Sequence, residues 1–363
     1  MRWDEVLRLT QRHRLISFVY HSLCRSDEES LPPEPARENL HRRFLFNAQR
    51  NLLLTSKLCE ILKWLETAGI QVLPYKGPAL AAAVYGDFSF RTFSDLDLIV
   101  PETEAPRARD LLLEKGFRHR SLLSGSRLGA TLKSQNHYQL VSECGQFLLE
   151  LHWAVVPPHF SLALPTTRLF ERSRPLLLAG GYLARDFSPE DLFLLLCVHG
   201  GKDYWERLSW IADVAEAIRR YPRTDWPQLL REARECGAER MVLFGFHLAR
   251  EFLDADLPSE IRERCESDRA LPALVERATR QLFQDDDARH HPVRSALFHM
   301  AIRERVSDRF RYAARFVWVV MTPTEKEWSR LSLPEGLFFL YYFLRPVRLG
   351  LKYLLKIGKR AWR

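Results

Sequence analysis

The sequence of 363 residues predicts a fold on the border of the α+β and α/β classes, with a small mixed sheet between N-terminal helices and a large helical domain. Short apolar segments typical of strands occur between residues 72 and 153. A long segment with apolar residues at helical spacing precedes them, and the pattern is almost wholly helical from Ser188 onward. The predicted parts are N-terminal helices at 1–69, a core at 70–156, an irregular, proline-rich linker at 157–187, and a helical domain with a basic amphipathic tail at 188–363.

Composition narrows the class of protein. Apolar residues make up 46% of the chain and charged residues 28%, as in an ordinary globular protein. The net charge of +8 favours an anionic partner, namely a nucleotide, a nucleic acid or an acidic lipid surface. The six cysteines are scattered without a Cys-x-x-Cys pair, which favours reduced thiols in the cytoplasm over disulfides or a zinc site. We expect no signal peptide, because charged residues interrupt the N-terminal segment, and no membrane helix, since no apolar run approaches ~20 residues.

Two helices are expected ahead of the sheet. Residues 1–25 predict one amphipathic helix, and residues 36–69 predict a long helix that braces the first strand and ends at Gly69. The segment between them, residues 26–35, is acidic and carries prolines, so a loop is expected there.

A glycine turn then opens the core. Val72–Tyr75 predicts a short strand, Lys76-Gly77-Pro78 turns the chain, and Ala79–Tyr85 predicts one or two helical turns. Pro78 suits the first helical position, where a missing N–H costs no hydrogen bond. The free N–H groups and the positive end of the helix dipole at this turn would attract a phosphate.

An acidic strand follows at Asp95–Val100. Asp95 and Asp97 are two residues apart, so on a strand both point to the same face. Two carboxylates on one face of an apolar strand repel each other unless a cation lies between them. Magnesium or manganese, with one or two carboxylates and substrate phosphates as ligands, is the expected cation. The alternative is that both aspartates only cap the start of an edge strand.

A second carboxylate-bearing strand is predicted further along the chain. After a helix at 101–115, a short strand at 117–120 and a loop at 121–134, residues 137–141 and 147–153 predict a hairpin. Glu150 and His152 share one face of its second strand. Glu150 is the candidate third carboxylate, as a metal ligand or as the base that takes a proton from the acceptor. For His152 both a structural role and a contact with the substrate stay open.

These motifs resemble the catalytic core of the DNA polymerase beta-like nucleotidyltransferases, whose signature is a glycine turn, Asp-x-Asp on the next strand and a later third carboxylate. Within that superfamily the chain is most similar to a bacterial family of uncharacterised nucleotidyltransferases. The resemblance lies in Tyr75-Lys76-Gly77, Arg91, Asp95-Leu96-Asp97-Leu98, Glu150-Leu151-His152-Trp153, the helical segment Pro189–Ala217, and Tyr341–Pro346. One departure is Pro78, which stands where many superfamily members have a serine that contacts the phosphates, so Lys76 or Arg91 is expected to replace that contact.

The helical half offers further candidates. His199 and Lys202 flank Gly200-Gly201, which we expect to break the helix and let a ligand approach the backbone. From there both side chains would reach a triphosphate, although Lys202 could equally complement the helix dipole. Asp213 is expected to be structural. Helices are predicted at about 189–200, 206–220, 225–236, 238–253, 258–266, 270–284, 293–305 and 307–321.

For two segments near the C-terminus we prefer a structural interpretation to a functional one. The acidic and histidine-bearing stretch at 284–291 is expected to be a solvated loop rather than a metal site. Residues 337–363 predict a basic amphipathic helix that docks on the protein, while peripheral contact with the inner face of a membrane stays open.

The resemblance implies transfer of a nucleoside monophosphate from a nucleoside triphosphate, with ATP expected, to a hydroxyl of a small molecule or peptide. Asp95, Asp97 and Glu150 would bind magnesium or manganese, and Lys76, the N–H of Gly77 and Arg91 would bind the phosphates. Two alternatives stay open: a phosphotransferase that uses the same site, and a nucleotide-binding or antitoxin-like protein without turnover. Duplex nucleic acid is not an expected partner, because no basic run with interleaved aromatic residues marks a duplex track.

Overall fold

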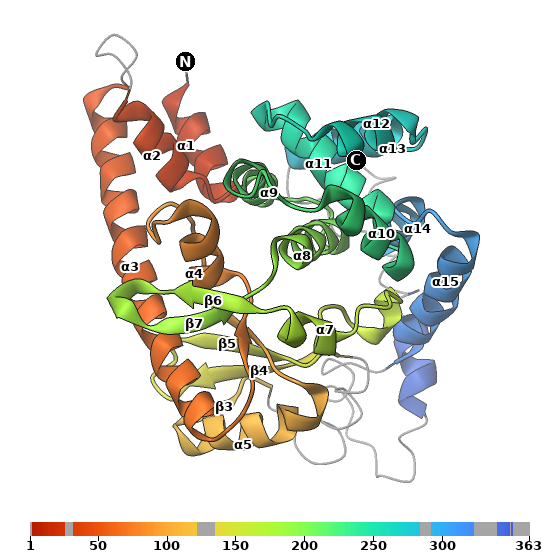
Figure 1. The fold of residues 1–363 in the computed structure, drawn as a ribbon, viewed down its shortest axis with the longest axis horizontal. Coiled ribbons are helices and arrows are strands. Elements are labelled where there is room, and N and C mark those ends of the chain that lie inside the picture. The colour runs from red at the N-terminus through yellow and green to blue at the C-terminus, as the bar shows by residue number, and fades with distance from the viewer. Residues whose placement is uncertain are drawn as a thin grey trace.

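The structure is a computed structural model that describes residues 2–25, 32–121, 135–283, 292–322 and 340–348, together with residue 350. Figure 1 shows the long helix α3 along one side, the sheet beside its lower half, and the helical half beside its upper half. This arrangement confirms the predicted combination of a small mixed sheet with N-terminal helices and a large helical part.

The main sheet has five strands in the order β1-β2-β5-β4-β3. The pair β2–β5 is parallel, and the other neighbouring pairs are antiparallel. This mixed pairing places β2 and β5 in the middle of the sheet, where leucines such as Leu98 and Leu151 are fully buried. The strands are β1 (Leu73–Pro74), β2 (Leu96–Ile99), β3 (Phe117–His119), β4 (His137–Ser142) and β5 (Leu148–His152).

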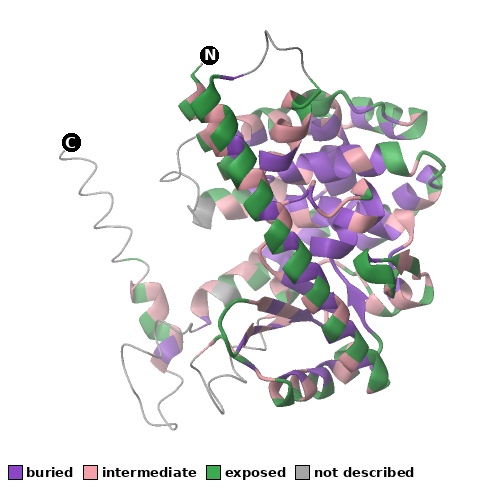
Figure 2. Cartoon of the chain, turned by 90° about the vertical axis from the view of Figure 1, so that its left-hand side faces the viewer, coloured by how far each residue is buried: buried purple, intermediate pink, exposed green. Residues whose placement is uncertain are grey.

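The N-terminal segment forms two helices, and the prediction of a single helix over residues 1–25 is wrong. Helix α1 (Trp3–Arg12) and helix α2 (Ile16–Leu23) are separated at Arg14, whose φ of 57° is incompatible with a continuous right-handed helix. Helix α3 (Glu34–Thr67) follows as predicted. Figure 2 shows α3 along the outside of the molecule, with exposed residues on its outer face and buried ones toward the core.

Short helical elements connect the strands. Helix α4 (Gly77–Leu80) continues into a π-helix, η2 (Ala81–Tyr85), directly after β1. Between β2 and β3 a 3₁₀ turn, η3 (Glu102–Glu104), leads into α5 (Ala105–Glu114). The glycine turn therefore opens a helix as predicted, and part of that helix is π-helical, a feature common near functional sites.

Residues 157–187 are not irregular, so this part of the prediction is wrong. The prolines of this segment separate short helices and strands, and they do not prevent secondary structure from forming. The hairpin β6–β7 packs β7 against β1, so it extends the core toward the helical half. The elements are η4 (Pro158–Phe160), α7 (Thr166–Glu171), β6 (Arg174–Leu177), η5 (Ala179–Gly181) and β7 (Leu183–Asp186).

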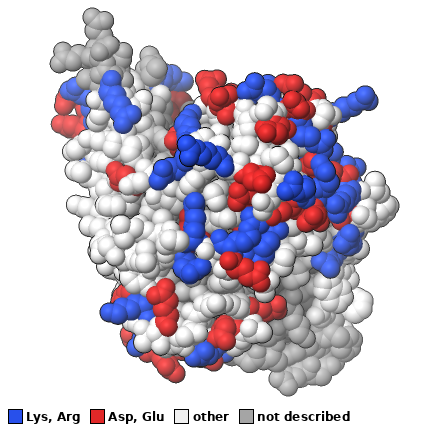
Figure 3. Space-filling model, in the orientation of Figure 1, with Lys and Arg blue, Asp and Glu red and all other residues white. Residues whose placement is uncertain are grey.

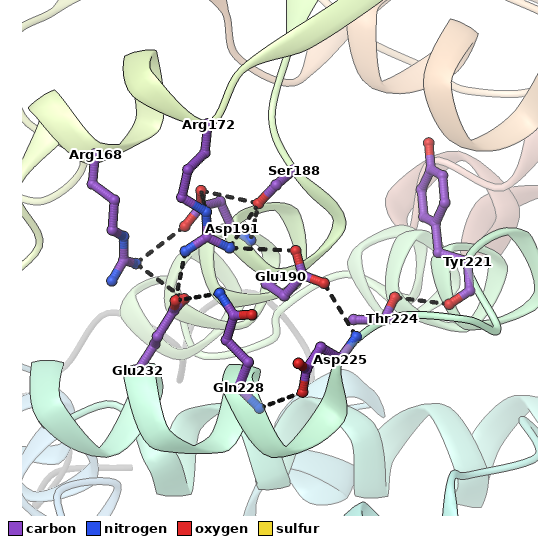
Figure 4. A network of polar contacts seen from close by, with 10 residues as sticks. All are labelled: Arg168, Arg172, Ser188, Glu190, Asp191, Tyr221, Thr224, Asp225, Gln228 and Glu232. Carbon is purple, nitrogen blue, oxygen red and sulfur yellow. Dashed lines mark hydrogen bonds and ion pairs between the residues drawn. The ribbon is translucent and has the colours of Figure 1, made fainter.

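A polar network anchors this segment to the helical half (Figure 4). Nη1 of Arg172 donates to Oε1 of Glu232 at 2.5 Å, and Nη2 of Arg168 donates to Oδ1 of Asp191 at 3.1 Å. Ser188 caps the next helix, since its Oγ accepts from the backbone N–H of Asp191 at 3.2 Å. The segment thus has fixed partners in the helical half, through arginines near its middle, and the boundaries between domains stay a prediction.

The helical half agrees with the predicted pattern. Its core includes Trp205, which is fully buried. Gly200 and Gly201 do not break their helix, and the prediction of a ligand-binding break there is wrong. A Cβ on Gly200 would lie 2.5 Å from the Trp205 indole, so that glycine makes room for packing. The helices are α8 (Pro189–Lys202), α9 (Leu208–Arg220), α10 (Trp226–Cys236), α11 (Glu239–Leu253), α12 (Ser259–Ser267), α13 (Leu271–Phe283), α14 (Pro292–Ala301) and α15 (Val306–Met321).

Charged side chains of both signs lie on the surface of the helical half. On the face shown in Figure 3, basic and acidic side chains are interspersed over the helical half, so on this face the charge does not form one patch. Among the described residues, no helix combines the length and apolar character needed to cross a bilayer. The stretch 284–291, most of the loop at 121–134 and most of the tail at 337–363 lie outside the described residues.

Candidate active site

Two carboxylates meet at the centre of the sheet. Strands β2 and β5 pair in parallel with Asp97 directly opposite Glu150. Residues paired in this way point to the same face of the sheet, so both side chains lie on one side of it. Glu150 thus occupies the strand and the face that the sequence predicts, while its role as a ligand or base stays a prediction.

His152 lies between these carboxylates. Its Nε2 is 3.1 Å from Oδ1 of Asp97 and 3.4 Å from Oε2 of Glu150. An ionised carboxylate only accepts hydrogen bonds, so Nε2 must carry the proton that binds Asp97. The side chain is 6% exposed. These contacts favour a role in positioning the carboxylates over direct contact with a substrate.

Both carboxylates are held in the ionised form. Burial would raise the pKa of Asp97, but the charge of Lys76 and the hydrogen bond from His152 outweigh it and bring the pKa well below its ordinary value. Burial likewise opposes ionisation of Glu150, and the hydrogen bond from His152 still leaves its pKa lowered. The site therefore presents two negative charges at neutral pH.

The strand that was expected to begin at Asp95 begins at Leu96, so Asp95 lies just before β2, beside the glycine turn. It is partly exposed, and Oγ of Ser94 lies 3.4 Å from its Oδ1. A Cβ on Gly77 would lie 3.5 Å from the backbone oxygen of Asp95, so the turn packs closely against this residue. Gly77 has a φ of 48° and Lys76 has a φ of 65°, so both residues of this turn have positive φ angles.

His137 and Gln139 on β4 complete the Glu150 side of the site. Nε2 of Gln139 donates to Oε1 of Glu150 at 2.9 Å. Nδ1 of His137 lies 3.1 Å from Oδ1 of Asn136, which assigns the proton to Nδ1 and leaves Nε2 as an acceptor, 3.8 Å from Oε1 of Glu150. Burial, with the neighbouring His152, lowers the pKa of His137 to about 4, so the ring is neutral at pH 7.

The helical half contributes charged groups to the same region. Lys202 Nζ lies 3.6 Å from Oδ2 of Asp203, and Nδ1 of His199 lies 3.0 Å from the same oxygen. Burial and the charge of Lys76 lower the pKa of His199 to about 4, so the electrostatic influence of the core turn reaches α8. Asp203 is held ionised against its burial mainly by Lys202, which brings its pKa well below the ordinary value.

Arg91 is placed differently from the prediction. Arg91 is predicted to bind the phosphates. In the structure it is 7% exposed, and its guanidinium binds Asp213 on α9. Nε donates to Oδ1 at 2.9 Å and Nη2 donates to Oδ2 at 3.0 Å. Both carboxylate oxygens of Asp213 are thus occupied, and the pair joins the core to the helical half. The phosphate-binding assignment of Arg91 is therefore corrected to a structural one.

Sequence reasoning missed His137, Asn136, Gln139 and Asp203. The register of the hairpin could have predicted the position of His137, because the short turn after β4 places His137 directly opposite His152. The only sequence indication for Asp203 is weaker: it directly follows Lys202, the predicted phosphate-binding lysine. Ligand atoms of His137, Glu150 and His152 lie within 4.8 Å of one another, and Nε2 of His137 carries no proton, so one nitrogen as well as oxygen ligands are available for a metal here.

Replacing Lys202 with alanine is expected to weaken the affinity for ATP about tenfold, if the phosphates lie where the sequence predicts, since one cation would then be removed from beside them. The side chain is 28% exposed and its one described ion pair, with Asp203, spans 3.6 Å, so the fold should be retained. Isothermal titration of ATP measures the affinity, with Lys63→Ala on the exposed side of α3 as the control. An unchanged dissociation constant would leave Lys202 as a helix-end cation.

A family model matches most of the chain. The model of the family described as uncharacterised nucleotidyltransferase matches residues 1–254, which include the sheet, the acidic strands and helices α8 to α11. No curated protein matches the chain significantly.

Two solved structures are similar to parts of the chain. The solution structure of the antibiotic-resistance factor ANT(2'')-Ia aligns at 16% identity and a TM-score of 0.30, over 63% of this chain and 98% of that one. The crystal structure of an antigenic nucleotidyltransferase-like protein from Paracoccidioides brasiliensis aligns at 16% identity and a TM-score of 0.31, over 50% and 89%. The family match covers well over half of the sequence, and the chain therefore belongs to the uncharacterised nucleotidyltransferase family.

Proposed function

We propose that the protein transfers a nucleoside monophosphate from a nucleoside triphosphate, with ATP as the expected donor, to a hydroxyl of a small molecule or peptide. The observation that carries this proposal is the direct pairing of Asp97 with Glu150 on one face of the sheet, beside a glycine turn that opens a helix. Family membership supports nucleotidyl transfer in general.

A divalent metal fits the residues present. The carboxylates of Asp97 and Glu150 are ionised, and Asp95, just before β2, would supply a third. Two acceptor atoms, Nε2 of His137 and Oε1 of Glu150, face each other at 3.8 Å without a proton between them, as atoms that share a cation would. Oxygen ligands favour magnesium, and the nearby imidazole suits manganese as well. When bound, such an ion would neutralise charge on the phosphoryl oxygens.

The other roles follow from position. Lys76 and the backbone N–H of Gly77 lie at the start of α4, where the helix dipole favours an anionic phosphate. Glu150 would take the proton from the attacking hydroxyl, and His152 would hold Glu150 and Asp97 in place through Nε2. Lys202, on the opposing helix α8, would approach the phosphates from the other side.

A phosphotransferase is the second candidate, because it needs the same carboxylates and differs only in which phosphorus is attacked. The ionised carboxylate cluster argues against a protein without turnover, since burying charge without a catalytic use is costly. We favour nucleotidyl transfer because the proposed base and the glycine turn lie on opposite sides of the acidic strand.

ATP labelled separately at the α and γ positions tests the reaction. We expect α label to enter an acceptor from small-molecule or peptide pools, with pyrophosphate accumulating, when magnesium or manganese is present. Mass spectrometry identifies the labelled acceptor, and protein treated with a chelator is the control. Transfer of γ label with release of ADP would establish the phosphotransferase instead.

A further inference from the structure

Three arginines from distant parts of the sequence converge beside Asp95. Nη2 of Arg14, between α1 and α2, donates to Oγ of Ser94 at 3.3 Å. Nη2 of Arg50, on α3, donates to the backbone oxygen of Ser94 at 3.2 Å. Arg207, just before α9, is close enough to Arg14 for its charge to affect that group. We call these three residues the arginine cluster; none of them belongs to the motifs identified from the sequence.

The cluster has an excess of positive charge. In the part of the chain that the structure describes, none of the three guanidinium groups has a carboxylate within ion-pair distance, whereas those of Arg91, Arg168 and Arg172 do. Burial, with the charge of Arg207, lowers the pKa of Arg14 to about 10, and Asp95 only partly opposes this shift. Arg14 is still cationic at neutral pH, so like charges are held together with no carboxylate in ion-pair contact among the described residues. An anion binding among them would relieve this repulsion.

The backbone holds the cluster in place. Arg14 has the left-handed φ of 57°, a conformation that costs free energy for a residue with a side chain. Neighbouring His13 fixes it, because its backbone oxygen accepts from the N–H of Ser209 and its Nδ1 accepts from the N–H of Leu208, each at 3.3 Å. The same contacts bring the α1–α2 corner to the start of α9, and so bring Arg14 and Arg207 together.

The place of the cluster in the sheet indicates which anion it would bind. Glu150 lies on β5, on one side of the acidic strand β2, whereas the glycine turn follows β1, on the other side. Ser94 and Asp95 immediately precede β2, next to that turn, so the arginines lie away from the proposed base. In an in-line displacement the leaving group departs opposite to the attacking oxygen.

We propose that Arg14, Arg50 and Arg207 bind the β- and γ-phosphates of the nucleoside triphosphate, and so hold the leaving pyrophosphate. This inference rests on the proposed function. The acceptor oxygen forms a bond to the α-phosphorus and its proton passes to Glu150. The bond from the α-phosphorus to the bridging oxygen breaks, and its electron pair leaves on the pyrophosphate, where the guanidinium groups stabilise the charge.

Binding measurements with the full-length protein test this. ATP, inorganic pyrophosphate and AMP are titrated, with magnesium, into the wild type, the double variant Arg14→Gln/Arg207→Gln, and Arg50→Gln. We expect ATP and pyrophosphate to bind about tenfold more weakly for each arginine removed, and AMP to change by less than about twofold. Arg42→Gln, an exposed position on the same helix as Arg50, should bind all three like the wild type. Arg14→Lys, which keeps the charge but loses the planar fork, should restore part of the affinity.

Either of two results would overturn the inference: unchanged affinity for pyrophosphate in the variants, or an equal loss for AMP and ATP. Arg50 is exposed, so Arg50→Gln keeps the test valid if the double variant fails to fold. Transfer of α label by the wild type is measured separately. Its absence contradicts the proposed function, whereas its presence together with unchanged pyrophosphate affinity in the variants contradicts the arginine assignment alone.

Discussion

Replacing both Asp95 and Asp97 with asparagine is expected to reduce nucleotidyl transfer by about 10³-fold or more, because the charges that would hold the metal and nucleotide are removed. The substitution keeps the shape of both side chains. Asparagine at 97 still offers an oxygen to Nε2 of His152, which now lies 3.1 Å from Asp97. The fold should therefore survive, and a loss of activity would not reflect unfolding.

A thermal-melting assay with ATP and magnesium measures the same effect without turnover. A ligand at 100 times its dissociation constant stabilises a protein by about 2.7 kcal/mol, and the double variant should lose the metal-dependent part of that gain. Asp110→Asn on α5, where the side chain is 57% exposed, is the matched control and should behave like the wild type. Equal stabilisation of the double variant and the wild type would show that these aspartates do not bind the metal.

The parts of the fold that depend on local pattern can be predicted from the sequence. Alternating apolar residues predict the central strands. The resemblance to the nucleotidyltransferases assigns Asp97 and Glu150 to one site, and the structure pairs the two residues on β2 and β5. Helix boundaries in the second half agree to within a few residues, except at the end of α14, because they are marked by caps such as Ser188 and by glycines such as Gly237, whose φ is 73°.

The failed predictions at Arg91, Arg14 and Gly200 depend on tertiary contacts that the local pattern does not reveal. Arg91 resembles a phosphate ligand because it precedes the acidic strand, and nothing local reveals Asp213, which lies 122 residues further on. In the sequence, Arg14 resembles one more charged residue of an amphipathic helix. The contacts of His13 with the start of α9, which stabilise the left-handed backbone of Arg14, are not visible there. Gly200 suggests a helix break because the sequence does not show that Trp205 folds back onto it.

Replacing Asp213 with alanine is expected to lower the free energy of unfolding by about 3–5 kcal/mol, the usual cost of leaving one partner of a buried ion pair unpaired. Asp213 is 1% exposed and Arg91 is 7% exposed. The hydroxyl of Tyr85 also donates to Oδ1 of Asp213, at 2.8 Å. The alanine variant would therefore leave a buried guanidinium and a buried hydroxyl without their acceptor, at the contact between the core and α9.

Chemical denaturation of the wild type and variants measures this cost, with Glu276→Gln as the matched control. Glu276 pairs with Arg280 at 2.8 Å, but both side chains are about two-thirds exposed, so its loss should change stability by less than about 1 kcal/mol. The double variant Arg91→Met/Asp213→Leu removes both charges and should recover most of the stability lost in Asp213→Ala. If Asp213→Ala costs no more than Glu276→Gln, the ion pair does not hold the two halves together. The helical half would then be positioned by apolar packing alone, as in the cluster that joins Ile99 and Tyr75 to Leu195 and Val214.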